Sequence, residues 1–194
     1  KNLEKLYKSY NLVGKKIYDD NDFLIDNLTV SRNLFTKISL ENKDPKPKRF
    51  EVYGLLSGLP FKKKLINSVT NIQNDISAIL DDKNFYLVKP SNLGVEYCVF
   101  KWPNGKWKKS WVTVIKKELR KIKIDPFNFH LVGIQVHRDG CIVAKGYSEK
   151  NSIFKIRKKM MEKIYFLPKK QSTWSHVPIG RILEPVGEKR FLEL

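Results

Sequence analysis

The sequence predicts an α+β fold in which antiparallel-rich sheets carry helices on their outer faces. After residue 48, runs rich in β-branched and aromatic residues alternate with amphipathic helical patterns. Two of these runs flank an Asp-Gly turn, which is typical of an antiparallel hairpin. The predicted order of elements also repeats weakly between the two halves, and this favours two pseudo-symmetric lobes.

The composition sets further limits. The chain has 194 residues, of which 41% are hydrophobic and 12% aromatic, enough to pack one domain or two small lobes that share a core. Cys98 and Cys141 lie within predicted strands, which indicates buried free thiols in a reducing, cytoplasmic compartment. No apolar run in the sequence is long enough to cross a bilayer.

The chain is strongly basic, with a formal net charge of +18 and a pI near 9.8. Such a charge attracts phosphate-rich partners, most simply RNA, DNA or nucleotides, and more weakly acidic membranes. The lysines are spread over the whole sequence. A general preference for lysine at surface positions therefore explains the charge as well as a phosphate-binding function does.

Residues 1–48 are predicted to form an N-terminal extension, with a short helix at 2–10 and a strand within 28–40. Two prolines among charged residues at 41–48 indicate an exposed connector. The compact, bilobal domain is predicted to span residues 49–194. The sequence does not indicate whether the extension covers the domain or adds an edge strand to it.

The first half of the domain is predicted to begin with a strand at 50–57, followed by a helix. The helix is indicated by an apolar stripe at helical spacing, formed by Leu65, Val69, Ile72, Ile76 and Ile79. Strands are predicted at 85–88 and 93–102.

In the second half, Ser110 is predicted to cap a helix, and strands at 127–137 and 141–147 are predicted to pair across Arg138-Asp-Gly140. Ser148 is predicted to cap a further helix with a basic outer face made of Lys155, Arg157, Lys158, Lys159 and Lys163. A strand carrying His176 is predicted within 173–183, and 190–194 is predicted to be a tail.

Residues 50–185 resemble the two-histidine phosphoesterases, the superfamily of LigT-like RNA 2′,3′-cyclic phosphodiesterases. The resemblance lies in the Phe-x-Phe-x-Leu-x-Gly-Ile run at 127–134, the Asp-Gly hairpin, the Lys145-Gly-Tyr147 strand end, an Ile-x-x-Ile-Arg helix and a histidine strand. It implies a central groove between the two lobes. It also implies two His-x-Thr/Ser motifs, one from each lobe, that face each other across that groove.

The sequence departs from both motifs of that superfamily. The second motif reads His176-Val-Pro178, so proline replaces the hydroxyl residue, and the first reads Gly94-Val-Glu96. The family chemistry requires one imidazole to accept a proton while the other donates one. The chain has only three histidines, and none precedes residue 130. A two-histidine mechanism cannot be written for this chain alone.

His176 is the strongest candidate, as a groove base or phosphate ligand, or otherwise as a hydrogen-bonded strand histidine. Glu96 is a candidate general base, with His176 as the acid, or otherwise a polar residue in a repurposed groove. Strand alternation predicts that the Arg181 side chain points away from the face that carries His176, so Arg181 is predicted to be a cation at the rim of the groove. The other candidate ligand-binding residues are Gly94, Pro178, Thr173, Ser175, Lys101 and Trp102.

Tryptophans and lysines also interleave at 101–111. This pattern can stack bases and hold phosphates, but such tryptophans also belong to cores, Trp111 above all. No glycine-rich phosphate loop, metal-spaced Cys/His cluster or nucleophile elbow is present in the sequence, so no cofactor or metal is predicted.

Three functions follow from these observations. The first is a degenerate phosphoesterase-like protein that binds RNA or a cyclic nucleotide in a basic groove without the two-histidine cleavage. The second is an enzyme, either a phosphodiesterase or a proton-transfer enzyme that uses His176 with Glu96. The third is a scaffold that binds a protein partner.

Overall fold

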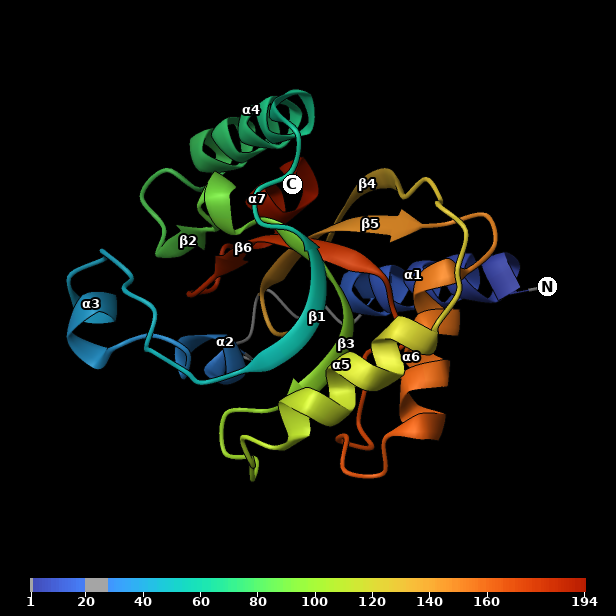
Figure 1. The fold of residues 1–194 in the computed structure, drawn as a ribbon. Helices are drawn as coiled ribbons and strands as arrows, with labels where there is room; N and C mark the ends of the chain where they lie inside the picture. The colour runs from blue at the N-terminus through green and yellow to red at the C-terminus, as the bar shows by residue number, and fades with distance from the viewer. Residues whose placement is uncertain (1, 20–27) are drawn as a thin grey trace.

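The computed structural model describes residues 2–19 and 28–194 (Figure 1). Two antiparallel sheets form its centre, which confirms the predicted α+β class. A two-stranded sheet pairs β1 (Tyr53–Gly58) with β3 (Gly94–Lys101), and a four-stranded sheet has the order β2 (Phe85–Leu87), β6 (His176–Ile182), β5 (Cys141–Tyr147) and β4 (His130–Val136). The helices of the described residues are α1 (Asn2–Asp19), α2 (Thr29–Arg32), α3 (Lys37–Glu41), α4 (Lys63–Leu80), α5 (Trp111–Lys121), α6 (Ser152–Lys163) and α7 (Glu188–Glu193), with a 3-10 turn η1 (Pro90–Asn92).

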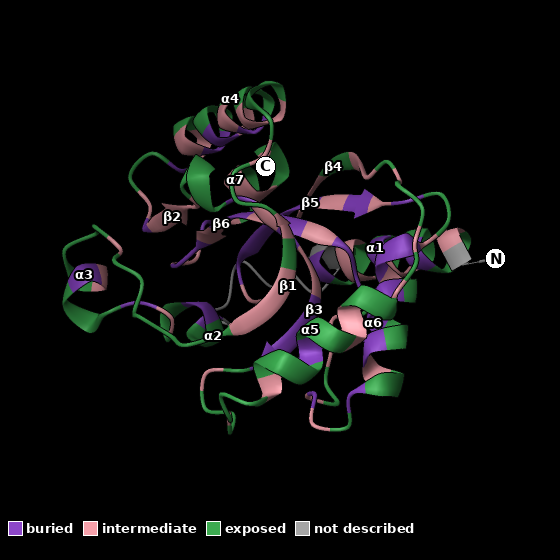
Figure 2. Cartoon of the chain, in the orientation of Figure 1, coloured by how far each residue is buried: buried purple, intermediate pink, exposed green. Residues whose placement is uncertain are grey.

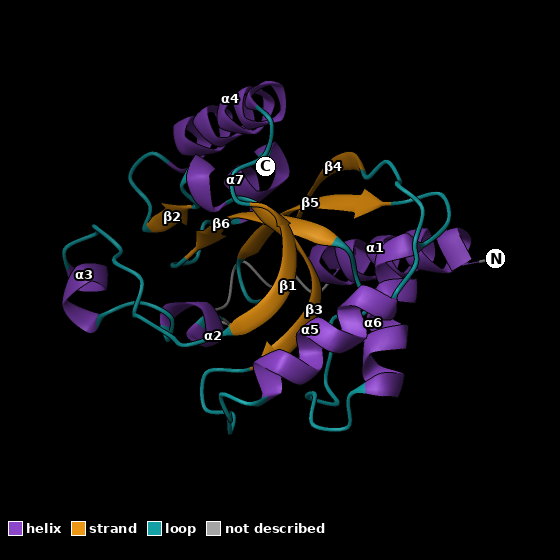
Figure 3. Cartoon of the chain, viewed as in Figure 1, coloured by secondary structure: helices purple, strands orange, loops and turns teal. Residues whose placement is uncertain are grey.

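The helices lie outside the sheets, and separate groups of them cover the two sheets (Figure 3). Helix α4 buries its apolar stripe against the four-stranded sheet, where Val69 and Ile76 join a core cluster with Ile142 and Val177. Helices α5 and α6 cover the two-stranded sheet, and Met160 of α6 packs with Cys98 in a second cluster. In Figure 2 the outward faces of α4, α5 and α6 are exposed and their inward faces are buried. The amphipathic patterns in the sequence therefore predicted the helices correctly.

The predicted hairpin is present as β4 and β5. The main-chain N–H of His137 donates to the oxygen of Cys141 at 2.8 Å, and the Asp139 carboxylate accepts from the N–H of Cys141 at 3.1 Å. Gly140 closes the turn with a positive φ of 81° and packs directly against the main chain of Ile182. A side chain at position 140 would collide with β6, so this turn requires glycine.

The N-terminal residues pack onto the domain. The Tyr10 hydroxyl of α1 lies 2.6 Å from the main-chain oxygen of Ser175 and 3.1 Å from that of Gly146. The indole N–H of Trp174 donates to the Ser9 hydroxyl at 2.8 Å. Ile17 and Leu28 are buried in the same cluster as the four-stranded sheet. Residues of the predicted extension are therefore part of the hydrophobic core.

Three local predictions were wrong. The strand expected within 28–40 is instead the short helices α2 and α3, with a single bridge between Phe35 and Pro47. In the expected tail at 190–194, all residues but Leu194 belong to α7, which lies beside α4 (Figure 1). Ser148 lies outside α6, whose N-cap is Asn151, although the Ser148 hydroxyl accepts from the N–H of Ser152 at 2.8 Å.

Both cysteines are buried and unpaired, as predicted. Within residues 2–19 and 28–194, no helix combines the length and the apolar character needed to cross a membrane.

Candidate functional site

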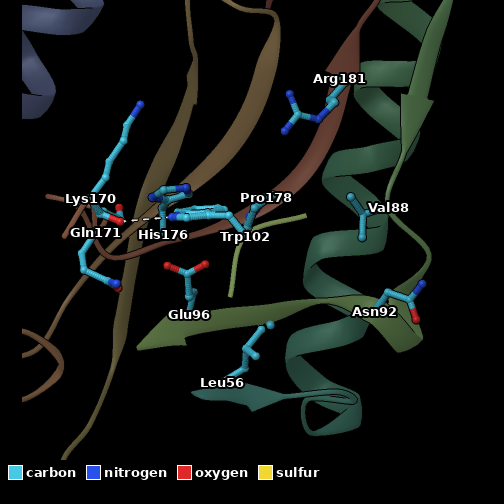
Figure 4. Close-up of a pocket in the computed structure, with 12 residues that line it drawn as sticks. Leu56, Val88, Asn92, Glu96, Trp102, Lys170, Gln171, His176, Pro178 and Arg181 are labelled. Atoms are coloured by element: carbon cyan, nitrogen blue, oxygen red, sulfur yellow. Dashed lines mark hydrogen bonds between the residues drawn. The ribbon is translucent and has the colours of Figure 1, made fainter. Parts of the chain in front are cut away.

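A pocket of about 470 Å³ lies between β3 and β6 (Figure 4). It brings together six of the residues that the sequence singled out, namely Gly94, Glu96, Trp102, His176, Pro178 and Arg181. Its other lining residues are Leu56, Val88, Asn92, Lys170, Gln171 and Ser172. The two segments compared with the superfamily motifs, 94–96 and 176–178, therefore line one cavity.

Strand alternation explains how the motif residues reach the pocket. Gly94 and Glu96 lie on one face of β3, and Val95 between them is buried on the other face with 1% of its surface exposed. His176 and Pro178 share a face of β6 in the same way, and Val177 between them is fully buried in the core.

Arg181 reaches the pocket because β6 contains an irregularity. In the pairing of β5 with β6, Ile142 lies opposite Gly180 but Val143 lies opposite Pro178, so β6 has one extra residue at this point. A bulge of this kind reverses the alternation beyond it. The prediction that Arg181 leaves the His176 face was therefore wrong.

Arg181 is held in place by two partners. Its guanidinium donates to the Ser31 hydroxyl at 2.8 Å and lies 3.4 Å from the Asp139 carboxylate. Part of its charge is thus balanced by Asp139, and the remainder contributes to the potential of the pocket.

Three predicted residues lie outside this pocket. Lys101 is buried and pairs with the Glu51 carboxylate at 2.7 Å. Ser175 is buried and donates to the main-chain oxygen of Gly146 at 2.8 Å. Thr173 lines a separate hollow of about 310 Å³ beside α1.

Arg157 is the main residue that the sequence reasoning misplaced. It was expected on the basic outer face of α6, but it points inward with only 5% of its surface exposed. Its position four residues after Ile153 and three before Met160, both of which are buried, places it on the apolar stripe of the helix. That spacing was the signal in the sequence that could have identified it.

The Arg157 guanidinium connects the two sides of the pocket. It donates to the main-chain oxygens of Glu96 at 3.2 Å and Tyr97 at 2.7 Å, both on β3. It also donates to the oxygens of Ser172 and Trp174, which precede β6. Because each acceptor is a neutral carbonyl, these bonds satisfy the donors of Arg157 without neutralising its charge.

Glu96 is half-buried in the pocket, and its carboxyl extends from β3 toward the strand of His176 (Figure 4). Burial raises the pKa of this carboxyl, and the Arg157 charge partly opposes that rise. Glu96 therefore takes up a proton at a higher pH than an exposed glutamate does.

His176 is half-buried near two other rings. Its ring centroid lies 5.8 Å from that of His137 and 6.2 Å from that of Trp174. Nδ1 of His176 and Nε2 of His137 are buried without a hydrogen-bond partner among the described residues. Burial, followed by the charges of His137 and Arg157, lowers the pKa of His176 to about 4. The imidazole is therefore neutral at pH 7.

His130 lies apart from this group. Its ring stacks on Tyr147 with centroids 4.9 Å apart, and Nε2 lies 3.5 Å from the Glu149 carboxylate.

The segment before β6 forms one wall of the pocket. The Gln171 side chain accepts from the N–H of Val99 at 2.8 Å and donates to its oxygen at 2.9 Å, as a neighbouring strand would. The Trp102 indole donates to the main-chain oxygen of Lys170 at 3.3 Å. These contacts hold Trp102, Lys170 and Gln171 in a polar, aromatic wall of the pocket. The sequence did not predict them.

The pocket combines one neutral imidazole, one carboxylate with a raised pKa, an indole and two peripheral cations. Its volume lies within the range that is usual for small-molecule sites. Among the residues that the structure describes, no group of three or more His, Cys, Asp or Glu side chains is placed to hold a metal ion.

No protein-family model matches this chain, and no curated protein is significantly similar to it.

Proposed function

We propose that this chain is a degenerate two-histidine phosphoesterase-like protein. In this proposal two lobes flank the pocket as a groove, and the pocket binds the end of an RNA or a cyclic nucleotide without cleaving it by the two-histidine mechanism. The observation that carries the proposal is that His176 shares its pocket with Gly94 and Glu96, and that no second histidine of the described residues lines it.

The protonation states favour binding over cleavage. Acid–base cleavage of a phosphodiester needs one group that gives a proton and one that takes it near the working pH. His176, with a pKa of about 4, is unprotonated at pH 7 and is a weak acid catalyst there. The Glu96 carboxylate repels an approaching phosphate unless it is protonated. The pocket is therefore better suited to hold a nucleotide than to break its phosphodiester bond.

The lining residues suit the parts of a nucleotide. Lys170 and Arg181 are cations that attract a phosphate, and Trp102 offers a ring on which a base can stack. Gln171 and Asn92 add amide groups at the wall. The buried charge of Arg157 adds positive potential behind the pocket.

An altered proton-transfer enzyme is the second candidate, and one observation favours it. Glu96 and His176 line the same pocket from facing strands, as a carboxylate–imidazole pair would. Such a pair suits an uncharged substrate better than a phosphodiester.

Calorimetric titration with adenosine 2′,3′-cyclic phosphate tests the proposal. We expect saturable binding that weakens at least about fivefold in Lys170→Ala and in Trp102→Ala, and that is unchanged in Lys159→Ala on the exposed side of α6. Chromatography of the same mixtures should recover intact cyclic nucleotide. Turnover that disappears in His176→Ala would establish the enzyme instead, and no binding at millimolar ligand would refute a nucleotide pocket.

A further inference from the structure

Two segments far apart in the sequence lie together beside the pocket. Residues 102–110 follow β3 and residues 164–172 follow α6, and both loops emerge below α5 and α6 in Figure 1. The hydrogen bond from Trp102 to the oxygen of Lys170 joins them at one end. At the other end Trp111, the first residue of α5, stacks its ring on Phe166, with centroids 4.2 Å apart and an interplanar angle of 10°. We call these two segments the lysine–aromatic rim.

The charge of the lysine–aromatic rim is all of one sign. Neither segment contains an aspartate or a glutamate. Five lysines in it are exposed, namely Lys106, Lys108, Lys109, Lys169 and Lys170. None of these five ammonium groups forms an ion pair within the described residues, whereas the neighbouring Lys101 is paired with Glu51. Unpaired cations at this density attract a polyanion.

Aromatic rings run through the same surface. Successive ring centroids are 4.7 Å apart between Tyr53 and Trp107, and 5.7 Å apart between Trp107 and Trp111. The row continues from Phe166 to Tyr165, whose centroids are 5.4 Å apart. Tyr53, Trp107 and Phe166 pack against the second core cluster, but Tyr165 at the end of the row is 91% exposed.

The exposure of Tyr165 is not explained by packing. A tyrosine at this exposure leaves most of its apolar ring in water, among lysines that face the same solvent. Trp102, which lines the pocket, is also 39% exposed. Exposed rings among unpaired cations are the combination that binds single strands, because bases stack on the rings while the cations hold the phosphates.

We infer that the lysine–aromatic rim is a binding surface for single-stranded nucleic acid. Lys106, Lys108 and Lys109 contact successive phosphates, and Tyr165 stacks on a base. Trp102 and Lys170 belong both to the rim and to the pocket, so a strand whose last nucleotide occupies the pocket continues over the rim. Only this path of the strand rests on the function proposed for the pocket; binding to the rim does not.

Fluorescence anisotropy with a labelled 12-nucleotide single-stranded RNA tests the inference. Tyr165→Ala should weaken binding at least about fivefold, the lower end of the effect of losing one stacked base. This exposed substitution leaves the core unchanged, so the fold should be retained. Lys108→Ala/Lys109→Ala should flatten the slope of log affinity against log salt by about 1.4, or about 0.7 for each lost phosphate contact.

The matched control is Lys63→Ala/Lys64→Ala at the exposed start of α4, on the opposite side of the molecule (Figure 1). It removes the same charge and should leave most of the affinity. Equal losses in the two double variants would overturn the inference, because the net charge of +18 would then suffice to explain binding. Equally tight binding of a duplex RNA of the same length would also overturn it.

The rim and the pocket can be separated in this experiment. Tyr165→Ala should bind adenosine 2′,3′-cyclic phosphate as the unsubstituted chain does. If the cyclic nucleotide does not bind but RNA affinity still depends on Tyr165, the pocket proposal fails and the rim inference stands. If RNA affinity is the same with and without Tyr165, the inference fails whatever the pocket binds.

Discussion

The guanidinium of Arg157 donates a hydrogen bond of 3.2 Å to the main-chain oxygen of Glu96, a residue 61 positions earlier in the chain. The same side chain also bonds the segment before β6 through Trp174. One buried side chain of α6 therefore sets the separation between the strand that carries Glu96 and the strand that carries His176. The shape of the pocket depends on a residue that does not line it.

Replacing Arg157 by leucine should destabilise the fold by roughly 3 kcal/mol, because several buried carbonyl oxygens would lose their donor. Arg157→Lys should destabilise the fold by less than Arg157→Leu does, since an ammonium keeps the charge but cannot bond all of the same acceptors. Urea denaturation measures both. Lys158→Leu, on the exposed side of the same helix, is the control and should change stability by less than about 0.5 kcal/mol. A stable Arg157→Leu protein would contradict the structural role assigned to this residue.

Glu96 should weaken the binding of anions to the pocket. Glu96→Gln removes a negative charge and keeps the shape of the side chain, so affinity for adenosine 2′,3′-cyclic phosphate should rise about fivefold at pH 7.5, or about 1 kcal/mol. Because burial raises the pKa of Glu96, affinity in the unsubstituted chain should also rise as the pH falls toward that pKa. This pH dependence should be absent from Glu96→Gln.

The control for Glu96 is Glu162→Gln, which makes the same change of charge on the outer face of α6. If it raised affinity as much as Glu96→Gln did, the effect would come from net charge and not from the pocket.

His176 should make the fold sensitive to acid. Its pKa is about 4 in the folded protein, below the ordinary value of 6.5 for histidine. Between these values the unfolded chain binds more protons, so the contribution of the neutral imidazole is complete above about pH 6.5 and is lost as the pH falls toward 4. Between pH 8 and pH 5 the loss should be about 2 kcal/mol. Between pH 8 and pH 5, the His176→Gln variant should therefore lose about 2 kcal/mol less stability than the unsubstituted chain.

A titration of the imidazole proton signals by NMR gives an independent measurement of His176. A midpoint far below 6.5 is expected, whereas a midpoint at 6.5 would mean that the ring is open to solvent. Burial also lowers the pKa of the adjacent His137, so part of the acid sensitivity should remain in the single variant.

The features that were predicted correctly depend on short-range regularities. The hairpin follows from an Asp-Gly turn between apolar runs, and α4 follows from one stripe at helical spacing. The alternation of side chains along a strand predicted that Gly94 and Glu96 share one face of their strand, and that His176 and Pro178 share one face of theirs. That these pairs line one pocket was expected only from the resemblance to a two-motif family, since alternation relates residues along a single strand.

The features that were missed depend on tertiary contacts. The bulge that turns Arg181 toward the pocket leaves no mark in the apolar pattern of β6. Arg157 was assigned to the outer face because it is charged, although its spacing matched the buried stripe. Ser31 lies in a segment with weak periodicity, and its partners are the distant Asp139 and Arg181.

The Tyr10 side chain should contribute substantially to stability, because it connects α1 to β5 and to the residue that precedes β6. It is buried, with 2% of its surface exposed, and its hydroxyl lies within hydrogen-bond distance of the Ser175 and Gly146 oxygens. Tyr10→Phe should cost about 1 kcal/mol for the hydrogen bond. Tyr10→Ala should cost about 3–5 kcal/mol, because it also leaves a cavity beside Trp174.

Tyr7 supplies the comparison for Tyr10, since it lies on the same helix but is 39% exposed. Tyr7→Ala should cost less than about 1 kcal/mol by the same denaturation measurement.

A chain that begins at residue 49 lacks Tyr10, Ile17 and Leu28, which are buried against the sheet, and it should therefore unfold at a much lower urea concentration than the full chain. If the shortened chain unfolded at the same urea concentration, the packing of α1 would contribute nothing to the stability of the domain.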